Sequence, residues 1–297
     1  MIKAIYNNIM KQRQEWLDWE KNRDEKFVFP ESVEYITNAP IGYGDFAAAD
    51  IYRPNNVNDK LPVIINIHGG GFVMGTRHQN HEMCACFAGK GFLVIAIDYP
   101  LVPESDVFGQ LDVISKSLNM IKDKLDELKG DEANVSLVGD SAGAFLALYT
   151  VAIQKSEKLQ AAAKVTKCTL SIRSLGLSSG LYYSTRVESN GIFLLRNSFF
   201  GKGWRKHAFY KYLNPENEEV IKALPRCILS TSDSDFLRKH TLQFANALKK
   251  HGIENQLVFI EADKSAEHAF NALYPTLSSS ITVNDSMVSF FKSQKIE

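Results

Sequence analysis

The sequence has no surplus of charge of either sign. Its 297 residues include 34 Lys and Arg and 34 Asp and Glu, so the formal net charge is zero with histidine neutral. A protein that binds nucleic acid by neutralising phosphates needs a basic surplus, usually clustered, and no long basic run supplies one. Nucleic acid is therefore not an expected partner.

Long hydrophobic runs are also missing. The longest uncharged stretch near the middle of the chain, residues 142–153, is shorter than the roughly 20 apolar residues that a bilayer-spanning helix needs. The first eight residues include Lys3 and lack the continuous apolar segment of a secretory signal. We therefore expect no membrane span and, by default, a cytoplasmic protein.

Cysteine is scarce and scattered. Cys84, Cys86, Cys168 and Cys227 are too few for a disulfide framework. The pair Cys84 and Cys86 has no second pair or suitably spaced histidine group that would complete a zinc site. The four residues are expected to be reduced structural thiols, and no metal site is expected.

The chain does contain a recurring pattern of short apolar runs followed by helix-like segments. This alternation predicts an α/β fold with a mostly parallel sheet flanked by helices, because strands covered on both faces are nearly continuous in Val, Ile and Leu. The predicted strands are residues 61–67, 92–97, 135–138, 168–172, 227–231 and 256–260, after a possible antiparallel pair at 32–37 and 46–52. Helices are predicted at residues 107–128, 141–154, 237–250 and from 269 to the end.

Two segments fall outside the alternation. Residues 1–26 carry apolar side chains at helical spacing and predict one or two amphipathic helices. Residues 177–224 form a long insertion rich in aromatics, namely Tyr182, Tyr183, Phe193, Phe199, Phe200, Trp204, Phe209, Tyr210 and Tyr212. The insertion is either an extra helical layer with its own core or a cap over an active site.

A candidate nucleophile lies in the pentapeptide Gly139-Asp140-Ser141-Ala142-Gly143, which fits G-x-S-x-G. It follows a predicted strand and precedes a predicted helix, the setting in which a strained turn lifts a serine hydroxyl out of a sheet. Glycine at both ends allows the helix to approach the strand closely. The alternative is a glycine-flanked turn with a capping serine, and Asp140 is expected to have a structural role.

A second glycine motif, His68-Gly69-Gly70-Gly71, directly follows the predicted strand 61–67. Bare N–H groups in such a loop can converge on an anion, so Gly70 and Gly71, with Ala142, are candidate oxyanion donors. A phosphate-binding loop is the rival interpretation, but the Lys-Ser/Thr ending of that motif is absent. His68 itself is expected to orient the loop.

Together the two motifs resemble the hormone-sensitive-lipase branch of the α/β-hydrolases, with its H-G-G-G loop and G-D-S-A-G elbow. The segment Asp98-Tyr99-Pro100-Leu101-Val102-Pro103-Glu104 is similar to the branch's D-Y-R-L-A-P-E. The resemblance implies a hydrolase core at residues 27–297, interrupted by a cap at 177–224, with 1–26 as an N-terminal cap segment. It also implies that Glu104 braces the site and that no cofactor is required.

The resemblance assigns the base and the acid in the chain order Ser, acid, His. His268, followed by Ala269-Phe270, resembles the family's H-G-F and is the expected general base, whereas His240 and His251 belong to an amphipathic helix and are expected at the surface. Aligning Leu237-Arg238 with the family's Pro-Leu-Arg run makes Asp235 the expected acid, with Phe236 where the family has proline. Asp233 is the alternative acid.

These assignments predict a serine carboxylesterase that hydrolyses small to medium acyl esters through an acyl-enzyme on Ser141. The same triad would serve an amidase, formamidase or peptidase, and nothing in the motifs separates these leaving groups. A non-catalytic ligand-binding protein on this fold is less favoured because Ser141, Asp235 and His268 are all present. The expected partner is a small-molecule ester, and a homodimer is left open.

Overall fold

The computed structural model describes residues 2–25, 27–186 and 196–293. Within these residues one sheet has the order β1-β2-β4-β3-β5-β6-β7-β8. The first two strands form an antiparallel hairpin that pairs antiparallel with β4, and every other pairing is parallel. The strands are β1 Val33–Tyr43, β2 Phe46–Pro54, β3 Leu61–Ile67, β4 Leu93–Ile97, β5 Gly130–Asp140, β6 Ser174–Ser178, β7 Arg226–Ser232 and β8 Asn255–Ile260. The predicted mostly parallel sheet is therefore confirmed.

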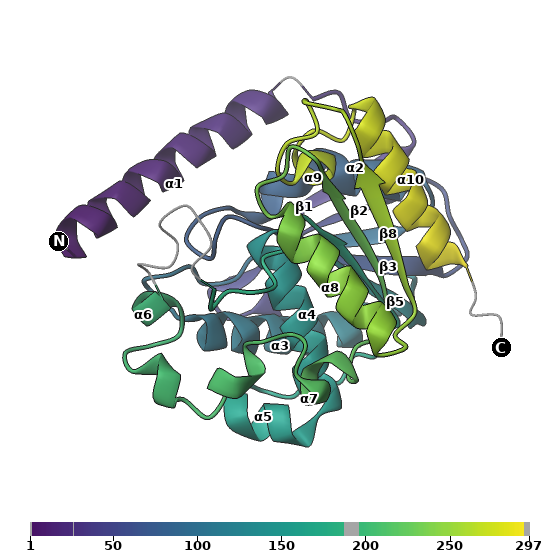
Figure 1. Ribbon diagram of the computed structural model, residues 1–297. Coiled ribbons are helices and arrows are strands. Elements are labelled where there is room, and N and C mark those ends of the chain that lie inside the picture. The colour runs from purple at the N-terminus through teal and green to yellow at the C-terminus, as the bar shows by residue number, and fades with distance from the viewer. Residues whose placement is uncertain (1, 26, 187–195, 294–297) are drawn as a thin grey trace.

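Helices cover both faces of this sheet (Figure 1). Ile65 and Ile67 of β3 pack in one core with α3, α4 and α8, whereas Ile64 packs in the other with α2, α9 and α10. Burial on both faces explains why β3 and β4 are apolar without alternation. The helices are α1 Ile2–Asp24, α2 His81–Gly89, α3 Val107–Lys124, α4 Ala142–Lys155, α5 Glu157–Ala163, α6 Arg196–Phe199, α7 Glu218–Ile221, α8 Arg238–Lys250, α9 Phe270–Leu273 and α10 Ser278–Lys292.

One predicted strand is wrong. Residues 168–172 run alongside α4 without joining the sheet, because the amide of Gln154 donates hydrogen bonds to the carbonyls of Cys168 and Leu170. The sheet position is taken by β6, which pairs with β5 from Ser174 onward. Cys168, Leu170 and Ile172 are buried in the core without strand pairing, whereas Thr169 and Ser171 between them are exposed.

The predicted helix from 269 to the end is two helices. The chain turns between α9 and α10 at Pro275, and a residue that precedes proline is disfavoured in helical conformation. Its last four residues, 294–297, lie outside the described part of the chain. The sequence analysis also missed α2 and α5, two short helices of the described chain.

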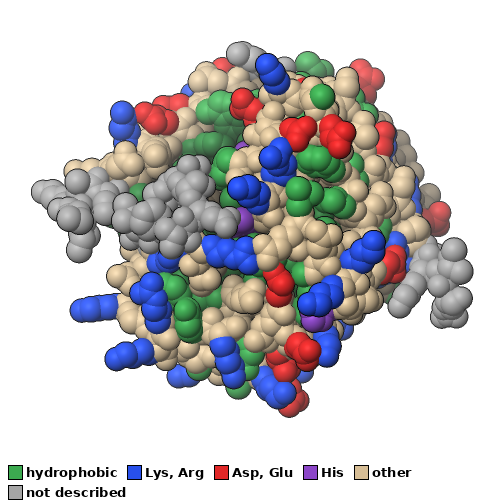
Figure 2. All heavy atoms as spheres, viewed as in Figure 1, with side chains coloured by type: hydrophobic (Ala, Val, Ile, Leu, Met, Phe, Trp, Pro, Cys, Tyr) green, Lys and Arg blue, Asp and Glu red, His purple; other side chains and the backbone are tan. Residues whose placement is uncertain are grey.

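The N-terminal segment is a single helix, α1, which runs beside the rest of the fold with few buried apolar side chains (Figure 1). No helix in the described ranges combines the length and the apolar character needed to cross a membrane. Figure 2 shows side chains of both charge signs on one face, with hydrophobic side chains exposed between them.

Candidate active site

Ser141 occupies a strained turn between β5 and α4. Its φ of 51° and ψ of −114° are unusual for a residue with a side chain. The turn is held from both sides, because the Ser141 N–H donates to the carbonyl of Ser178 at 2.9 Å and the Ser141 carbonyl accepts from Leu181 at 3.0 Å. These bonds fix the backbone while the side chain stays partly accessible.

The glycines around Ser141 are required by close backbone approach. A Cβ atom on Gly143 would lie 2.1 Å from the carbonyl oxygen of Ile67, and one on Gly139 would lie 2.5 Å from the carbonyl oxygen of Gly143. Backbone cannot yield as a flexible side chain can. The G-x-S-x-G spacing therefore follows from packing α4 against β3 and β5.

His268 and Asp235 meet Ser141 at the same edge of the sheet. The three residues follow β5, β7 and β8, and the carboxyl ends of parallel strands lie together. The Nε2 atom of His268 lies 2.9 Å from the Ser141 Oγ, and its Nδ1 atom lies 2.7 Å from the Asp235 Oδ1. The structure thus brings together the nucleophile, base and acid named from the sequence.

Asp235 is built to remain ionised. Its burial would raise the pKa, but the hydrogen bond and charge of His268 and the donors of Thr231 and Leu237 hold the pKa below the usual aspartate value. The alternative acid, Asp233, points elsewhere, since its carboxylate pairs with Arg238 at 2.7 Å and accepts from the N–H of Ala262.

The glycine loop after β3 is bent sharply over the end of the strand. Gly70 has a φ of +98°, and a Cβ there would lie 2.0 Å from the carbonyl oxygen of Met74. The carbonyl of Gly70 accepts from Val73 and Met74. Within the described hydrogen bonds, the N–H groups of Gly70 and Gly71 donate to no protein acceptor, so both are available to a ligand oxygen.

Asp140 ties this loop to the nucleophile turn. Its buried carboxylate accepts from the N–H of Gly69 at 3.1 Å, from Gln79 at 3.1 Å and from Asn80 at 2.8 Å. Burial raises the pKa of Asp140, and the Asn80 and Gly69 donors act in the opposite direction. The structural role expected for Asp140 is therefore specific. From its position directly before Ser141, its carboxylate holds Gly69, the residue before Gly70.

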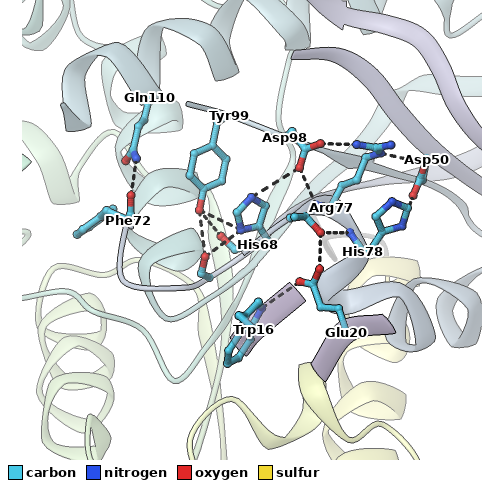
Figure 3. A network of polar contacts seen from close by, with 12 residues as sticks. Trp16, Glu20, Asp50, His68, Phe72, Arg77, His78, Asp98, Tyr99 and Gln110 are labelled. Carbon is cyan, nitrogen blue, oxygen red and sulfur yellow. Dashed lines mark hydrogen bonds and ion pairs between the residues drawn. The ribbon is translucent and has the colours of Figure 1, made fainter. Parts of the chain in front are cut away.

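The buried ring of His68 lies between Tyr99 and Asp98, with its Nε2 atom 3.9 Å from the Asp98 carboxylate (Figure 3). Its ring stacks on Tyr99 at a centroid distance of 4.3 Å, and the Tyr99 hydroxyl donates to the His68 carbonyl at 2.7 Å. Burial lowers the pKa of His68, which favours the neutral ring. Gln110 supports the next part of the loop by donating to the carbonyl of Phe72 at 3.0 Å.

A charged cluster supports the segment after the loop (Figure 3). Arg77 pairs with Asp50 and Asp98, and His78 lies 3.0 Å from the second oxygen of Asp50. The hydrogen bond to Asp50 raises the pKa of His78 despite the opposing effect of burial. For Asp50, burial acts to raise the pKa, but His78, Asn38 and Arg77 together hold it well below the usual value.

Helix α1 binds this same region through polar side chains. Arg13 donates to the carbonyls of Val73 and Val102 and forms two bonds with Glu104, at 2.7 and 3.0 Å. Further along the helix, the buried Glu20 accepts from Thr76 at 2.7 Å. Glu104 therefore anchors α1 rather than bracing the site directly.

The aromatic insertion contacts the glycine loop and α4. Phe72 packs edge to face against Phe145 of α4 and Phe199 of α6, both at 5.3 Å. Further along, the hydroxyl of Tyr149 donates to the carbonyl of Tyr212 at 2.7 Å. Residues 177 and 178 belong to β6, and Phe193 lies outside the described residues.

Two other features differ from the sequence analysis. His240 is buried, because its ring packs against Tyr183 at 5.3 Å and accepts from the Tyr183 N–H, whereas it was expected at the surface. Arg13 was not recognised as part of the site's support, because its partners lie 60 to 91 residues away in sequence.

No group of three or more His, Cys, Asp or Glu in the described ranges could hold a metal ion.

Comparison with known families gives one match over most of the chain. A family defined by the alpha/beta hydrolase fold matches residues 64–271. The match includes the glycine loop, the nucleophile turn, Asp235 and His268. It confirms the resemblance drawn from the motifs at the level of the family.

Curated relatives match over only part of their own length. The chain is 23% identical over 231 residues to an isoprenylcysteine alpha-carbonyl methylesterase of Arabidopsis thaliana, covering 73% of this chain and 54% of that protein. It is 33% identical over 94 residues to carboxylesterase NlhH of Mycobacterium tuberculosis, covering 31% of this chain and 30% of that protein. The chain thus spans about half, or less, of the curated relatives that it matches first.

Among solved structures, esterase B from Lactobacillus rhamnosis has the same fold. It superposes with a TM-score of 0.86, at 23% identity, over 97% of this chain and 94% of that one. At this identity the superposition shows the fold alone.

Proposed function

Because the chain belongs to the family with the alpha/beta hydrolase fold, we propose that it is a serine carboxylesterase. The observation that carries the proposal is the continuous hydrogen-bonded series from Ser141 through His268 to Asp235, with distances of 2.9 and 2.7 Å. A nucleophile that bonds a base, itself oriented by a buried carboxylate, is the arrangement that acyl transfer requires.

In the first step Ser141 attacks the ester carbonyl. His268 takes the hydroxyl proton at Nε2, and Asp235, bonded at Nδ1, stabilises the resulting imidazolium. The negative charge on the carbonyl oxygen is stabilised by the N–H groups of Gly70, Gly71 and Ala142, each of which contributes about 100- to 1000-fold to turnover in comparable sites. The proton then passes from Nε2 to the leaving alcohol, and an acyl-enzyme remains on Ser141.

In the second step water replaces the alcohol beside His268. The imidazole removes a proton from the water, which attacks the acyl carbonyl, and the proton returns to Ser141 as the carboxylic acid leaves. No metal or organic cofactor takes part in either step. The strained backbone of Ser141 and the fixed glycine loop supply a site that is organised before the substrate binds.

The division into core and cap is part of the same proposal. We assign residues 27–297 to the hydrolase core, the insertion within 177–224 to a cap, and residues 1–26 to a second cap segment. The contacts of Phe199 with Phe72, and of Arg13 with Val73, support this division, since both reach the loop that carries Gly70. The aromatic character of the insertion favours small to medium acyl groups over long ones.

The test is hydrolysis of p-nitrophenyl acetate and butyrate, with labelling by an organophosphate probe. We expect release of nitrophenol and stoichiometric labelling of the wild type, and neither reaction with Ser141→Ala. Equal rates for the wild type and the variant, without labelling, would refute the proposal. Acetanilide and formamide substrates in the same panel test whether amides are cleaved instead of esters. Cleavage of amides alone would support the triad and refute the ester substrate class.

A further inference from the structure

Phe236 lies beside the reacting groups and is not used by the mechanism above. Its ring packs against the imidazole of His268 with centroids 4.1 Å apart and planes tilted by 34°. The residue is nevertheless 52% exposed, whereas Phe72 after the glycine loop and Phe145 of α4 are fully buried. A phenyl ring held at the surface exposes apolar area to water, and covering that area is favourable.

Hydrogen bonds hold the backbone on both sides of Phe236. Asp235 precedes it, and the Asp235 carboxylate accepts from the N–H of Leu237 at 2.9 Å. The Asp235 carbonyl accepts from the N–H of Arg238, the first residue of α8, at 3.0 Å. The backbone on both sides of Phe236 is thus fixed by hydrogen bonds. The turn therefore sets the position of the Phe236 backbone, although the side chain itself is half exposed.

The direction of proton transfer indicates what meets this ring. His268 Nε2 takes the Ser141 proton and then delivers it to the alcohol oxygen, so the alcohol part of the ester must lie next to the imidazole when it leaves. The acyl carbonyl is held instead at Ser141 and the glycine loop. The exposed side of Phe236 therefore flanks the space taken by the alcohol part.

We propose that Phe236 is a specificity-determining residue that forms an apolar wall on the alcohol side of the site and selects esters whose alcohol part carries an aromatic ring. The inference rests on the proposed esterase function. Two aromatic rings in offset or edge contact gain about 2- to 12-fold in affinity beyond the effect of burying area. An aliphatic alcohol of one or two carbons is too short to make this contact.

The experiment compares kcat/KM for benzyl acetate and methyl acetate in the wild type, Phe236→Ala and Phe236→Tyr. Both esters form the same acetyl-enzyme, so deacylation is common and kcat/KM reports the step in which the alcohol leaves. We expect the benzyl-to-methyl ratio to fall about 3- to 10-fold in Phe236→Ala and to be retained in Phe236→Tyr, which keeps the ring.

Two controls separate the alcohol side from general effects. Tyr43→Ala removes another exposed aromatic, 40% exposed on β1, and should leave the ratio unchanged. The ratio of benzyl butyrate to benzyl acetate should change less than twofold in Phe236→Ala, because those esters differ only in the acyl part.

Each other outcome overturns the inference in a recognisable way. If Phe236→Ala lowers both acetates by the same factor, the ring acts through the position of His268 and not on the alcohol. If the butyrate-to-acetate ratio changes instead, Phe236 lies on the acyl side. If the wild type hydrolyses no ester, the proposed function itself fails. If the wild type is active but Phe236→Ala has the same benzyl-to-methyl ratio, only the role of Phe236 is refuted.

Discussion

Replacing Arg13 with alanine is expected to release α1 from the rest of the protein without unfolding the hydrolase core. The guanidinium of Arg13 is 18% exposed and makes the bonds that join α1 to Val73, Val102 and Glu104. Among the α1 side chains that the structure describes, Ile9 is the buried hydrophobic one. Docking of this helix therefore depends on polar contacts more than on a hydrophobic face.

The size of the effect follows from the bonds that the guanidinium makes. Hydrogen bonds from a charged donor contribute about 1.5–3 kcal/mol each, and two of them end on backbone carbonyls. The pair with Glu104, whose side chain is 50% exposed, adds about 0–1 kcal/mol. Water replaces part of these bonds when α1 leaves, so we take the lower end, about 3 kcal/mol, which corresponds to a roughly 150-fold rise in the opening equilibrium of α1.

Amide hydrogen exchange followed by mass spectrometry measures this opening directly. Peptides within residues 2–24 should exchange faster in Arg13→Ala, while peptides from β3 and β5 keep their protection. Lys11→Ala is the matched control on the same helix, because the ion pair of Lys11 in the described structure is with Glu15 on α1 itself, and both side chains are largely exposed. Arg13→Lys keeps the charge without the planar fork and should give an intermediate rate.

The same variant tests whether α1 supports the glycine loop. Val73 follows the glycines of the loop by two residues, and its carbonyl loses a partner when Arg13 is removed. We expect kcat/KM for p-nitrophenyl acetate to fall about tenfold, with the larger part of the loss in kcat, because misplacement of an oxyanion donor raises the transition state most. Unchanged exchange in α1, or faster exchange across the whole protein, would refute the reasoning.

Two further predictions concern charged side chains. Asp235→Asn should lower kcat about 10,000-fold, as loss of the orienting carboxylate does in comparable triads. Asp233→Asn should keep kcat within about threefold of the wild type. Steady-state kinetics that show the larger loss in Asp233→Asn would make Asp233 the acid of the triad. The pKa of His78 is raised by Asp50, so its contribution to stability is complete below about pH 6.5 and is lost as the pH rises through the folded-state value. Urea unfolding from pH 6 to 9 should therefore show the stability difference between the wild type and His78→Gln shrinking with pH, and a constant difference would contradict the ion pair.

The backbone geometry of the site was predictable from sequence because it imposes glycine at particular positions. The turn at Ser141 needs glycine at 139 and 143, since the neighbouring backbone atoms lie within 2.5 Å of any Cβ placed there. The bend at Gly70 is equally restrictive. These constraints fall on glycines that lie close together in the sequence, so they appear as motifs. The order of parallel strands then brings the motifs to one edge of the sheet.

What the sequence analysis missed depends on side chains that meet across long separations. His240 has the spacing of a surface residue on α8, yet the segment after β6 covers it with Tyr183. Residues 168–172 have the composition of a strand, yet Gln154 of α4 occupies their carbonyls. In both cases contacts with a distant element are involved, and hydrophobic periodicity contains no information about them.

The two proposed cap segments reach the glycine loop by different physical means, and this difference bears on how each can move. The insertion contacts Phe72 through aromatic rings, and the hydrophobic burial that this contact provides is non-directional and tolerates small shifts. Helix α1 contacts the same loop through Arg13 and Glu20, whose bonds require fixed geometry and exchange readily with water when broken. The insertion can therefore adjust to acyl groups of different size while remaining in contact, whereas α1 is either docked or released. A substrate that needs more room on the side of α1 must break the Arg13 bonds as a unit, so selectivity there should be a threshold in size and not a gradual decline.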